Sequence, residues 1–474
     1  MREKTAASPG ESIVNRGLSV ARFDALLFLL VWFAYGVVTN SDNQFRFNLP
    51  HIGIEAIVER HQFYLEGSRV PELQPYGDVF LYQGHKYAAK QPGEAMAGAV
   101  AYSALRAAGL QYSKNYWLTS ALVTFLTTSL VLAASAVGIF GVAQNLTKDA
   151  QSLFWPLLTT FAYALATTVF AYSGIAHHDA LATGYLVLAF YFIFQISRQG
   201  RPYGRGALLM SAAAGLLLGL TVTTSMLPFF MVLVCAIYFL SLRRVKLVPI
   251  FLAAMLIGLL PLFVYNARSF GNPFLLSNVV SAAQFPDTFF YFGAKNFGEK
   301  IVFYSSMIIV YVPVFAIGLF GLTYYPRTFK RTPVFVTLVA LLVVLMAYVL
   351  NIDTRGHCQF GPRYLLPAMP FACLGIAGFS YLSTGSERRI AGAVVVLLAF
   401  LSFGVNLVGA VQGAMCCPDG RNALRNQLTS LAHRNFNSFP LAPWLLVPLA
   451  LCAVLLVVSV ARRRDARLYF TRYT

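Results

Sequence analysis

Residues 332–351 read TPVFVTLVALLVVLMAYVLN, a stretch without a single charged side chain. An α-helix rises about 1.5 Å per residue, so this segment spans about 30 Å, the thickness of the hydrocarbon core of a bilayer. A membrane-barrel strand would alternate apolar and polar side chains, whereas the run from Leu338 to Leu350 is continuously apolar. The segment therefore predicts a transmembrane helix.

Similar segments recur along the whole chain, which is 58% hydrophobic, only 11% charged and has a mean hydropathy of +0.64. A soluble protein of this length could not bury so much apolar surface, and helices satisfy their own backbone hydrogen bonds in lipid. We expect an all-α integral membrane protein in which residues 1–474 form a single polytopic domain of about twelve transmembrane helices. The predicted spans are 19–39, 117–140, 152–172, 180–197, 207–224, 226–242, 247–265, 302–324, 332–351, 363–383, 388–411 and 441–461.

Basic residues recur in alternate short loops, which predicts that these loops face the cytoplasm. The loop clusters lie at 198–205, 243–246, 327–331, 388–389 and 462–467, and further basic residues precede the first span. Both termini are then cytoplasmic, in the plasma (inner) membrane, provided that residues 94–110 form an interfacial helix on the outer face instead of a span. The net charge of +18 follows mostly from this topology, with a second contribution from contact with anionic membrane lipids. We do not expect nucleic-acid binding, because the basic residues are dispersed and no recognition motif accompanies them.

The polar loop at residues 41–116, inserted after the first span, holds seven of the 18 acidic residues. Residues 49–64 of this loop have the periodicity of an amphipathic helix lying on the membrane. In that interpretation His51, Glu55, Glu59 and His61 belong to a solvated face. Because the loop gathers ionisable groups at one membrane face, we expect the chemistry of the protein to take place there, on the extracytoplasmic side.

Asp42 follows the first span directly, among Asn and Gln side chains that can orient it. A carboxylate in this position can accept the proton of a substrate hydroxyl as a general base. Further along, His85, Lys86 and Tyr87 precede Lys90, which lies before a Pro-Gly turn. We expect this stretch to contact substrate and Lys90 to meet a phosphate as a point charge, the alternative being a lysine that extends to lipid headgroups.

Three later segments deliver charged groups to the same face. His178 and Asp179 begin the fourth span and can contact a sugar or phosphate, although Asp179 can equally cap the helix. Arg268 ends the seventh span on the side where the positive-inside rule does not place it, which indicates an anionic partner such as phosphate. Arg355, Arg363 and Tyr364 precede or begin the tenth span, and Arg363 needs an anionic partner, either Asp353 or Asp42 or a substrate phosphate.

The cysteines fall into two groups. Cys235, Cys373 and Cys452 lie within predicted spans and are expected to be packing residues. Cys358, Cys416 and Cys417 lie in outer loops, where a disulfide from Cys358 to one of the vicinal pair or free thiols are both open. The cysteines show no metal-ligand spacing, and we assign no residues to a metal site. No cofactor is required, and a divalent metal is possible but not indicated.

The order of these motifs resembles the GT-C membrane glycosyltransferases, in particular the group of protein mannosyltransferases and lipid A aminoarabinose transferases. The resemblance covers nearly the whole chain. It rests on an acid after the first span, the Lys90-Gln91-Pro92 motif, and the Gly-Pro-Arg-Tyr-Leu-Leu-Pro segment from Gly361 to Pro367.

This resemblance implies a large first outer loop with juxtamembrane helices and transfer of a sugar from a polyprenyl-phosphate donor to a glycan, lipid or protein acceptor. Asp42 would correspond to the loop acid and Lys90 to the lysine that meets the donor phosphate, while Arg268 and Arg363 match by context. We expect a single displacement that inverts the anomeric carbon. The alternatives are a transporter or flippase for a lipid-linked glycan, and a ligase- or polymerase-like enzyme that uses a diphosphate-linked glycan.

Overall fold

A computed structural model describes residues 9–40, 48–74, 77–149, 152–198, 204–285, 296–352, 359–414 and 423–471. Asp42, Asp353, Arg355 and the three loop cysteines Cys358, Cys416 and Cys417 lie outside these ranges. The described part is almost entirely helical, as expected for the all-α class, and its one sheet has two strands.

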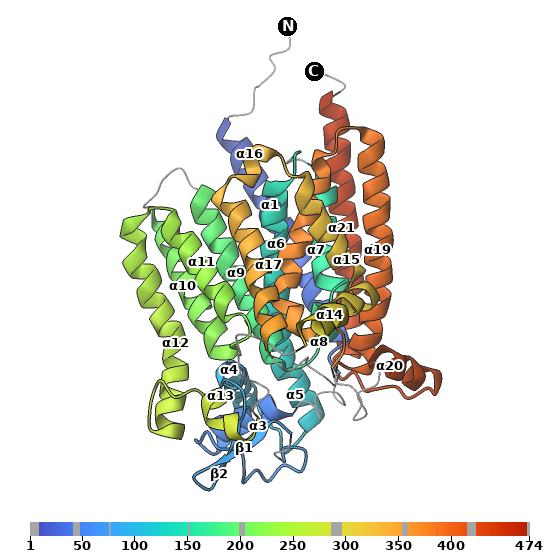
Figure 1. Cartoon of the computed structure of the whole chain (residues 1–474). Coiled ribbons are helices and arrows are strands. Elements are labelled where there is room, and N and C mark those ends of the chain that lie inside the picture. Colours follow the sequence, from blue (N-terminus) through green and yellow to red (C-terminus); the bar gives the residue numbers. More distant parts are fainter. Residues whose placement is uncertain are drawn as a thin grey trace.

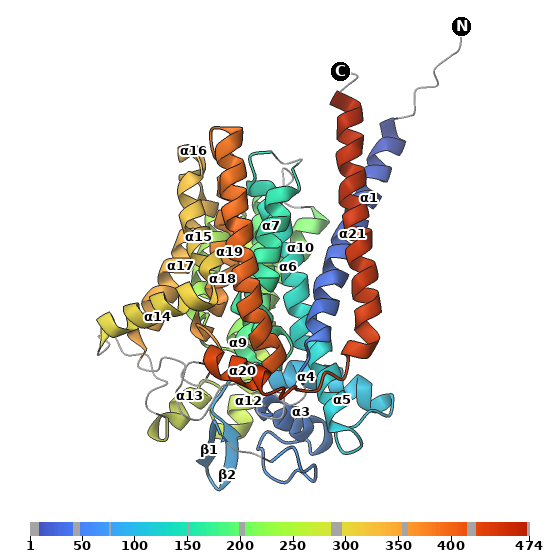
Figure 2. The ribbon, with the colours of Figure 1, turned by 90° about the vertical axis from the view of Figure 1, so that its right-hand side faces the viewer.

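The helices form a long bundle with a smaller cap at one end (Figure 1). In the first half of the bundle they are α1 (Pro9–Val37), α5 (Tyr116–Thr124), the π-helix η1 (Phe125–Ser129), α6 (Leu130–Leu146), α7 (Phe154–Leu165), α8 (Thr168–Ser173), α9 (His178–Arg198), α10 (Arg205–Thr224) and α11 (Phe229–Ser241). In the second half they are η2 (Val245–Leu247), α12 (Val248–Phe270), α14 (Phe297–Tyr311), α15 (Pro313–Gly321), η5 (Leu322–Tyr324), α16 (Arg327–Lys330), α17 (Pro333–Asn351), η6 (Arg363–Ala368), α18 (Met369–Cys373), η7 (Leu374–Tyr381), α19 (Gly385–Gln412) and α21 (Ala442–Thr471). The short helix α20 (Ala423–Ala432) lies crosswise at the cap end of the bundle, below α19 (Figure 2).

Each of the twelve predicted spans coincides with one helix or with two or three consecutive helices, but within the described residues fewer than twelve segments are long enough to cross a membrane. Within the described residues, eight segments have the required length and apolar composition, or up to nine if the bent pair of α14 and α15 counts as one span. That pair is bent by 101°. The helices α7 and α11 rise only about 18–20 Å at 1.5 Å per residue. The expected count of about twelve spans is therefore not confirmed.

Glycines let several bundle helices approach each other to backbone contact. A Cβ atom on Gly215 of α10 would lie 2.1 Å from the carbonyl oxygen of Phe251 on α12. Likewise, a Cβ atom on Gly375 of η7 would lie 2.0 Å from the carbonyl oxygen of Gly318 on α15. Small residues at helix contacts are the usual way in which helices associate in lipid, where apolar side chains gain little by burial.

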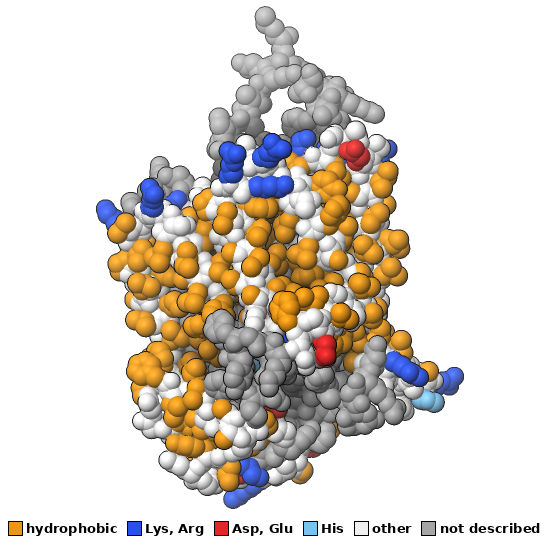
Figure 3. All heavy atoms as spheres, in the orientation of Figure 1, with side chains coloured by type: hydrophobic (Ala, Val, Ile, Leu, Met, Phe, Trp, Pro, Cys, Tyr) orange, Lys and Arg blue, Asp and Glu red, His pale blue; other side chains and the backbone are white. Residues whose placement is uncertain are grey.

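The flanks of the bundle expose mainly hydrophobic side chains, and Lys and Arg side chains gather at its end near α16 (Figure 3). The first helix, α1, lies beside the last, α21, along the length of the bundle (Figure 2). The N-terminal end of α1 and the C-terminal end of α21 lie at the end of the bundle opposite the cap (Figure 1). This arrangement is that of a multi-pass membrane protein, while the cytoplasmic assignment of that end stays a prediction.

The cap is built by the segment between α1 and α5. It contains α3 (Leu49–Glu59), the antiparallel strands β1 (Val79–Tyr82) and β2 (His85–Ala88), and α4 (Gly93–Ala107), with α13 (Ser277–Val280) and η3 (Ser281–Ala283) beside it. The strands pair through a two-residue turn at Gln83 and Gly84, whose φ angles of 49° and 84° suit the right-handed twist of a hairpin. The α4 helix, which the sequence places on the membrane surface, is not among the segments long enough to span.

The three span cysteines, Cys235, Cys373 and Cys452, are free and buried, consistent with packing residues.

Candidate functional site

The hairpin of the cap brings Lys90 against an acid that the sequence analysis did not single out. Val79 of β1 pairs with Ala88 of β2, and one step beyond this pair the Ala89 amide donates to the carbonyl oxygen of Asp78 at 2.8 Å. The ladder thereby places the Lys90 Nζ atom 3.0 Å from the Asp78 Oδ2 atom. The Lys90 ammonium holds the pKa of the Asp78 carboxyl below its usual value, and the charges of Arg363 and His178 act in the same direction.

A second ion pair lies at the start of α9. The Asp179 carboxylate accepts a hydrogen bond from the Ser225 hydroxyl at 2.7 Å, and its Oδ2 atom lies 3.8 Å from the Nε atom of Arg363. The His178 Nε2 atom lies 3.4 Å from the other carboxylate oxygen. Asp179 and Arg363 are buried, with 2% and 7% of their surface exposed, so each charge needs its partner. Arg363 thus meets an anionic partner that the sequence analysis did not name for it.

The two ion pairs belong to one cluster, because Arg363 and His178 are close enough to act on the Asp78 carboxyl. Four segments contribute to it: the hairpin, the start of α9, the end of α10 and the start of η6. Within this cluster, Lys90 and Arg363 carry two positive charges against two negative charges on Asp78 and Asp179. The site therefore offers cations at the junction between the cap and the bundle.

The start of α4 packs closely against the end of α10, which contributes to this cluster. A Cβ atom on Gly93 would lie 2.5 Å from the Thr224 hydroxyl and 2.6 Å from the Thr223 carbonyl oxygen, so only glycine allows this approach. The next residue, Glu94, is buried, and its Oε1 atom accepts from the Thr128 hydroxyl of η1 at 3.4 Å. Burial raises the pKa of the Glu94 carboxyl well above its usual value, and the negative charge of Asp179 raises it further.

His85, Lys86 and Tyr87 of β2 are engaged inside the cap. The His85 Nδ1 atom lies 2.6 Å from one Glu66 oxygen, and the Lys86 amide donates to the other at 2.9 Å. Tyr87 is buried and packs edge-on against Phe270 of α12, with ring centroids 5.4 Å apart. The backbone connects these three residues to Lys90, but the interactions found for their side chains lie within the cap and with α12.

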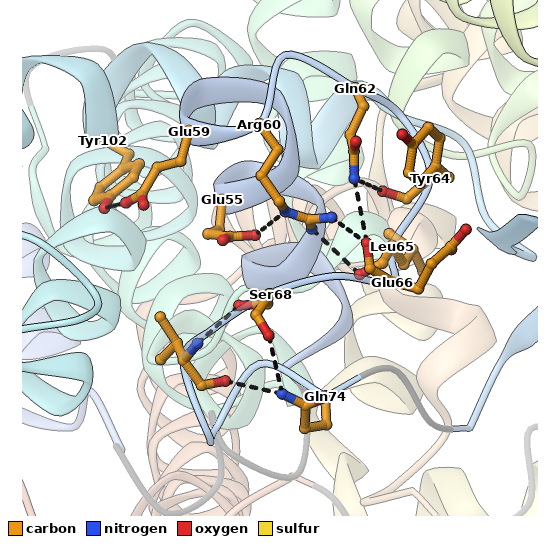
Figure 4. Close-up of polar contacts among 11 residues, drawn as sticks. Glu55, Glu59, Arg60, Gln62, Tyr64, Leu65, Glu66, Ser68, Gln74 and Tyr102 are labelled. Atoms are coloured by element: carbon orange, nitrogen blue, oxygen red, sulfur yellow. Dashed lines mark hydrogen bonds and ion pairs between the residues drawn. The ribbon is translucent and has the colours of Figure 1, made fainter.

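The residues of α3 correct one expectation. His51 and Glu55 are buried instead of solvated, because α4 and the loop after α3 cover this helix. Figure 4 shows the Arg60 side chain reaching Glu55 and the following loop, with 2.8 Å between the Arg60 Nε and Glu55 Oε2 atoms. Glu59 accepts a hydrogen bond from Tyr102 of α4, as Figure 4 also shows. These groups hold the cap together.

The remaining candidates lie apart or outside the described ranges. Arg268 is exposed near the end of α12, and the described residues show no ion pair to it. Tyr364 lies next to the cluster, with the Arg363 guanidinium carbon 4.5 Å from the centre of its ring. Asp42 and Arg355 are outside the described residues. Asn40, which precedes Asp42 by two residues in the chain, is anchored by its backbone amide, which donates to the Gly174 carbonyl oxygen at 3.2 Å.

Three residues of this region were not predicted from the sequence, namely Asp78, Glu94 and Ser225. A signal was available for Asp78: two short strands around a Gln-Gly turn predict a hairpin that places residue 78 across from residues 89 and 90. No local pattern identifies Ser225 or Glu94, since their roles come from contacts with distant helices. Among the described residues, no group of three or more His, Cys, Asp or Glu side chains is placed to hold a metal ion.

No family model and no curated protein matches the chain. Among solved structures, an oligosaccharyltransferase from Archaeoglobus fulgidus, in complex with Zn and sulfate, is similar with a TM-score of 0.52 and 13% identity, over 83% of this chain and 54% of that one. ArnT from Cupriavidus metallidurans bound to undecaprenyl phosphate gives a TM-score of 0.48 and 14% identity, over 97% of this chain and 73% of that one. The first likeness shows that the chain shares the fold of that oligosaccharyltransferase.

Proposed function

We propose that this chain is a GT-C membrane glycosyltransferase that moves a sugar from a polyprenyl-phosphate donor to an acceptor at the cap end of the bundle. The observation that carries the proposal is the convergence of Lys90 and Arg363 beside Asp78 and Asp179, where the cap meets the bundle. The shared fold supports the class of enzyme, and the sequence motifs support the class of donor.

The two cations suit a lipid-linked phosphate. The Lys90 side chain is 23% exposed, so its ammonium can exchange Asp78 for a phosphate oxygen. The Nε atom of Arg363 is buried and has no hydrogen-bond acceptor among the described residues, which leaves a donor for the same ligand. At 4 Å and an effective dielectric constant near 20, one such contact is worth about 4 kcal/mol, against about 1 kcal/mol in bulk water. Stabilising the negative charge that grows on the leaving phosphate is therefore the main chemical task of the cluster.

Asp42 is our candidate for the general base. Two hydrogen bonds fix Asn40 in place. Its backbone amide donates to the carbonyl oxygen of Gly174, in the loop that leads to His178, and its side-chain amide donates to the Val411 carbonyl oxygen at 2.9 Å. Two extended residues span at most about 7 Å, so the chain length allows residue 42 to reach this part of the molecule. In the proposed step, the acceptor oxygen bonds to the anomeric carbon, Asp42 takes the acceptor proton, and the polyprenyl phosphate leaves with the electron pair. One displacement inverts the anomeric carbon.

The proposal needs no cofactor, and it treats a divalent metal as unnecessary, because the cations of the chain itself face the phosphate. The acceptor class, whether glycan, lipid or protein, stays open. We propose the extracytoplasmic face of the plasma membrane for this chemistry, which follows from the basic loops at the opposite end of the bundle.

The test is whether the protein, purified in detergent and supplied with a cell-envelope extract as the source of acceptor, consumes a polyprenyl-phosphate sugar and releases polyprenyl phosphate. A transporter or flippase for the same lipid has no membrane to work across in detergent, so turnover separates the two functions. Asp42→Asn should abolish turnover and leave expression and donor binding intact, whereas Glu72→Gln, a neutralised acid elsewhere on the cap, should keep turnover. Full activity of Asp42→Asn would refute its assignment as the base.

A further inference from the structure

A groove lies at the end of the bundle opposite the cap, far from the proposed site. It has a volume of about 900 Å³ and is lined by the α6–α7 connection, the end of η7 and the first turns of α19. The Lys148 amide donates to the Ser380 hydroxyl at 2.9 Å and thereby joins two of these walls. In Figure 2 the start of α19 lies at the same end of the bundle as α16.

One end of the groove is cationic. Lys148, Arg388 and Arg389 line it, and Asp149 is the only acid among the described residues that line the groove. Lys148 and Arg389 are exposed, and Arg388 is half-buried. The excess of positive charge selects for an anion.

The other end of the groove is apolar and runs along α19. Arg388, Gly392 and Val396 all line the groove at helical spacing, so they share one face of the helix. Eight residues of helix rise about 12 Å, and the groove therefore passes from the charged end of the bundle toward its lipid-facing flank. Trp155 and Phe154 form its aromatic wall, with ring centroids 5.0 Å apart.

Retention of basic residues on the cytoplasmic side explains why Lys and Arg occur at this end, but it does not require a groove. It also does not explain why an apolar and aromatic channel continues from the cations into the flank of the bundle. A molecule with an anionic head and a hydrocarbon tail matches both parts. Basic pockets between membrane helices are known to hold acidic lipid headgroups.

We propose that this groove binds one anionic phospholipid, with its phosphate against Lys148, Arg388 and Arg389 and one acyl chain along Ala393 and Val396. The lipid would join the α6–α7 connection to α19 at the bundle end opposite the cap. This inference is independent of the proposed sugar transfer, because none of its residues belongs to the Lys90 cluster.

The experiment is native mass spectrometry of the full chain in detergent, titrated with dioleoyl phosphatidylglycerol or dioleoyl phosphatidylcholine. We compare the wild type with the triple variant Lys148→Gln, Arg388→Gln, Arg389→Gln. The matched control is Arg243→Gln, Arg244→Gln, Lys246→Gln, which removes the same charge from the same end of the bundle. We expect the wild type to bind the anionic lipid at least about tenfold more tightly, the groove variant to lose about 100-fold in affinity, and the control to change less than about threefold.

A second pair of variants tests the apolar part. Ala393→Trp fills the groove and should weaken binding of both lipids, while Val394→Trp, on an exposed neighbouring position that does not line the groove, should not. An equal loss in both charge variants would overturn the proposal, because bulk surface charge would then explain binding. Displacement of the lipid by millimolar inorganic phosphate, with no effect of Ala393→Trp, would also overturn it and indicate a free-anion site. Thermal melting of each variant shows whether it is folded.

Discussion

Replacing Lys90 by Met should reduce sugar transfer far more than it reduces stability. The substitution keeps a long apolar stem and removes the ammonium group that lies 3.0 Å from Asp78. At that distance an effective dielectric constant near 20 gives about 5.5 kcal/mol for the bare Coulomb attraction. The Asp78 side chain is 55% exposed, and solvent screening reduces such pairs to about 1 kcal/mol or less. The free protein should therefore lose little stability.

The donor complex should lose more. In the proposed complex the Lys90 ammonium would face a phosphate at a half-buried site, where one contact is worth about 2 to 4 kcal/mol. Because the negative charge on the phosphate grows in the transition state, this loss should lower kcat/KM by about 30- to 1000-fold.

The assay measures release of polyprenyl phosphate over a range of donor concentrations, alongside thermal melting in the same detergent. Lys114→Met is the matched control, because Lys114 is an exposed lysine of the same cap away from the cluster. A folded Lys90→Met variant whose kcat/KM stays within about threefold of the wild type would refute the phosphate role of Lys90. A large loss of stability with unchanged kcat/KM would make the lysine a structural partner of Asp78.

Three further predictions concern the cap and the helix contacts. Burial raises the pKa of the Glu94 carboxyl, so above pH 4.5, the usual pKa, the folded protein keeps a proton that the unfolded chain has lost. The stability of the protein should therefore fall as the pH rises above that value. Glu94→Gln should flatten this fall in melting temperatures recorded from about pH 5 to about pH 8. Gly375→Leu should lower the free energy of unfolding by about 2 kcal/mol or more, because its Cβ atom would lie 2.0 Å from the Gly318 carbonyl oxygen. A Cβ atom on Gly404 would meet no atom within 4 Å, so Gly404→Leu should melt like the wild type. Gly84→Val should lower the stability by about 1 to 2 kcal/mol, because the φ angle of 84° is unfavourable for valine, and should lower kcat/KM by displacing the hairpin. Gly84→Asn should keep most of the stability and most of the activity. An unchanged melting temperature of Gly84→Val would contradict this account.

Much of the fold could be predicted from the sequence, because long apolar runs leave few solutions in a membrane. Segments such as 332–351 must form helices there, and the structure has a helix from Pro333 to Asn351. The number of full-length spans could not be predicted in the same way. The hydropathy of residues 302–324 predicts one long apolar span. It does not predict the sharp bend at Pro313, where α14 ends and α15 begins.

The candidate site was predictable only in part. The sequence selected Lys90, His178, Asp179 and Arg363 one by one, from their positions at the ends of spans or in the first loop. It placed Asp42 and Arg268 in the same group, and for these two the described residues provide no contact with the cluster. The solvated face assigned to His51 and Glu55 was wrong, because amphipathic periodicity identifies two faces of a helix but not what covers them.

By itself, the sequence determined that this protein is a helical membrane bundle with a polar cap, since backbone hydrogen bonding in lipid and the length of each apolar run depend only on local composition. The tertiary structure decided which charges meet. Lys90 pairs with Asp78 through the register of one hairpin, and Arg363 pairs with Asp179 because η6 packs against α9. These pairings depend on contacts between segments distant in the chain, whose geometry is set by close helix packing and cannot be read from the composition of either segment.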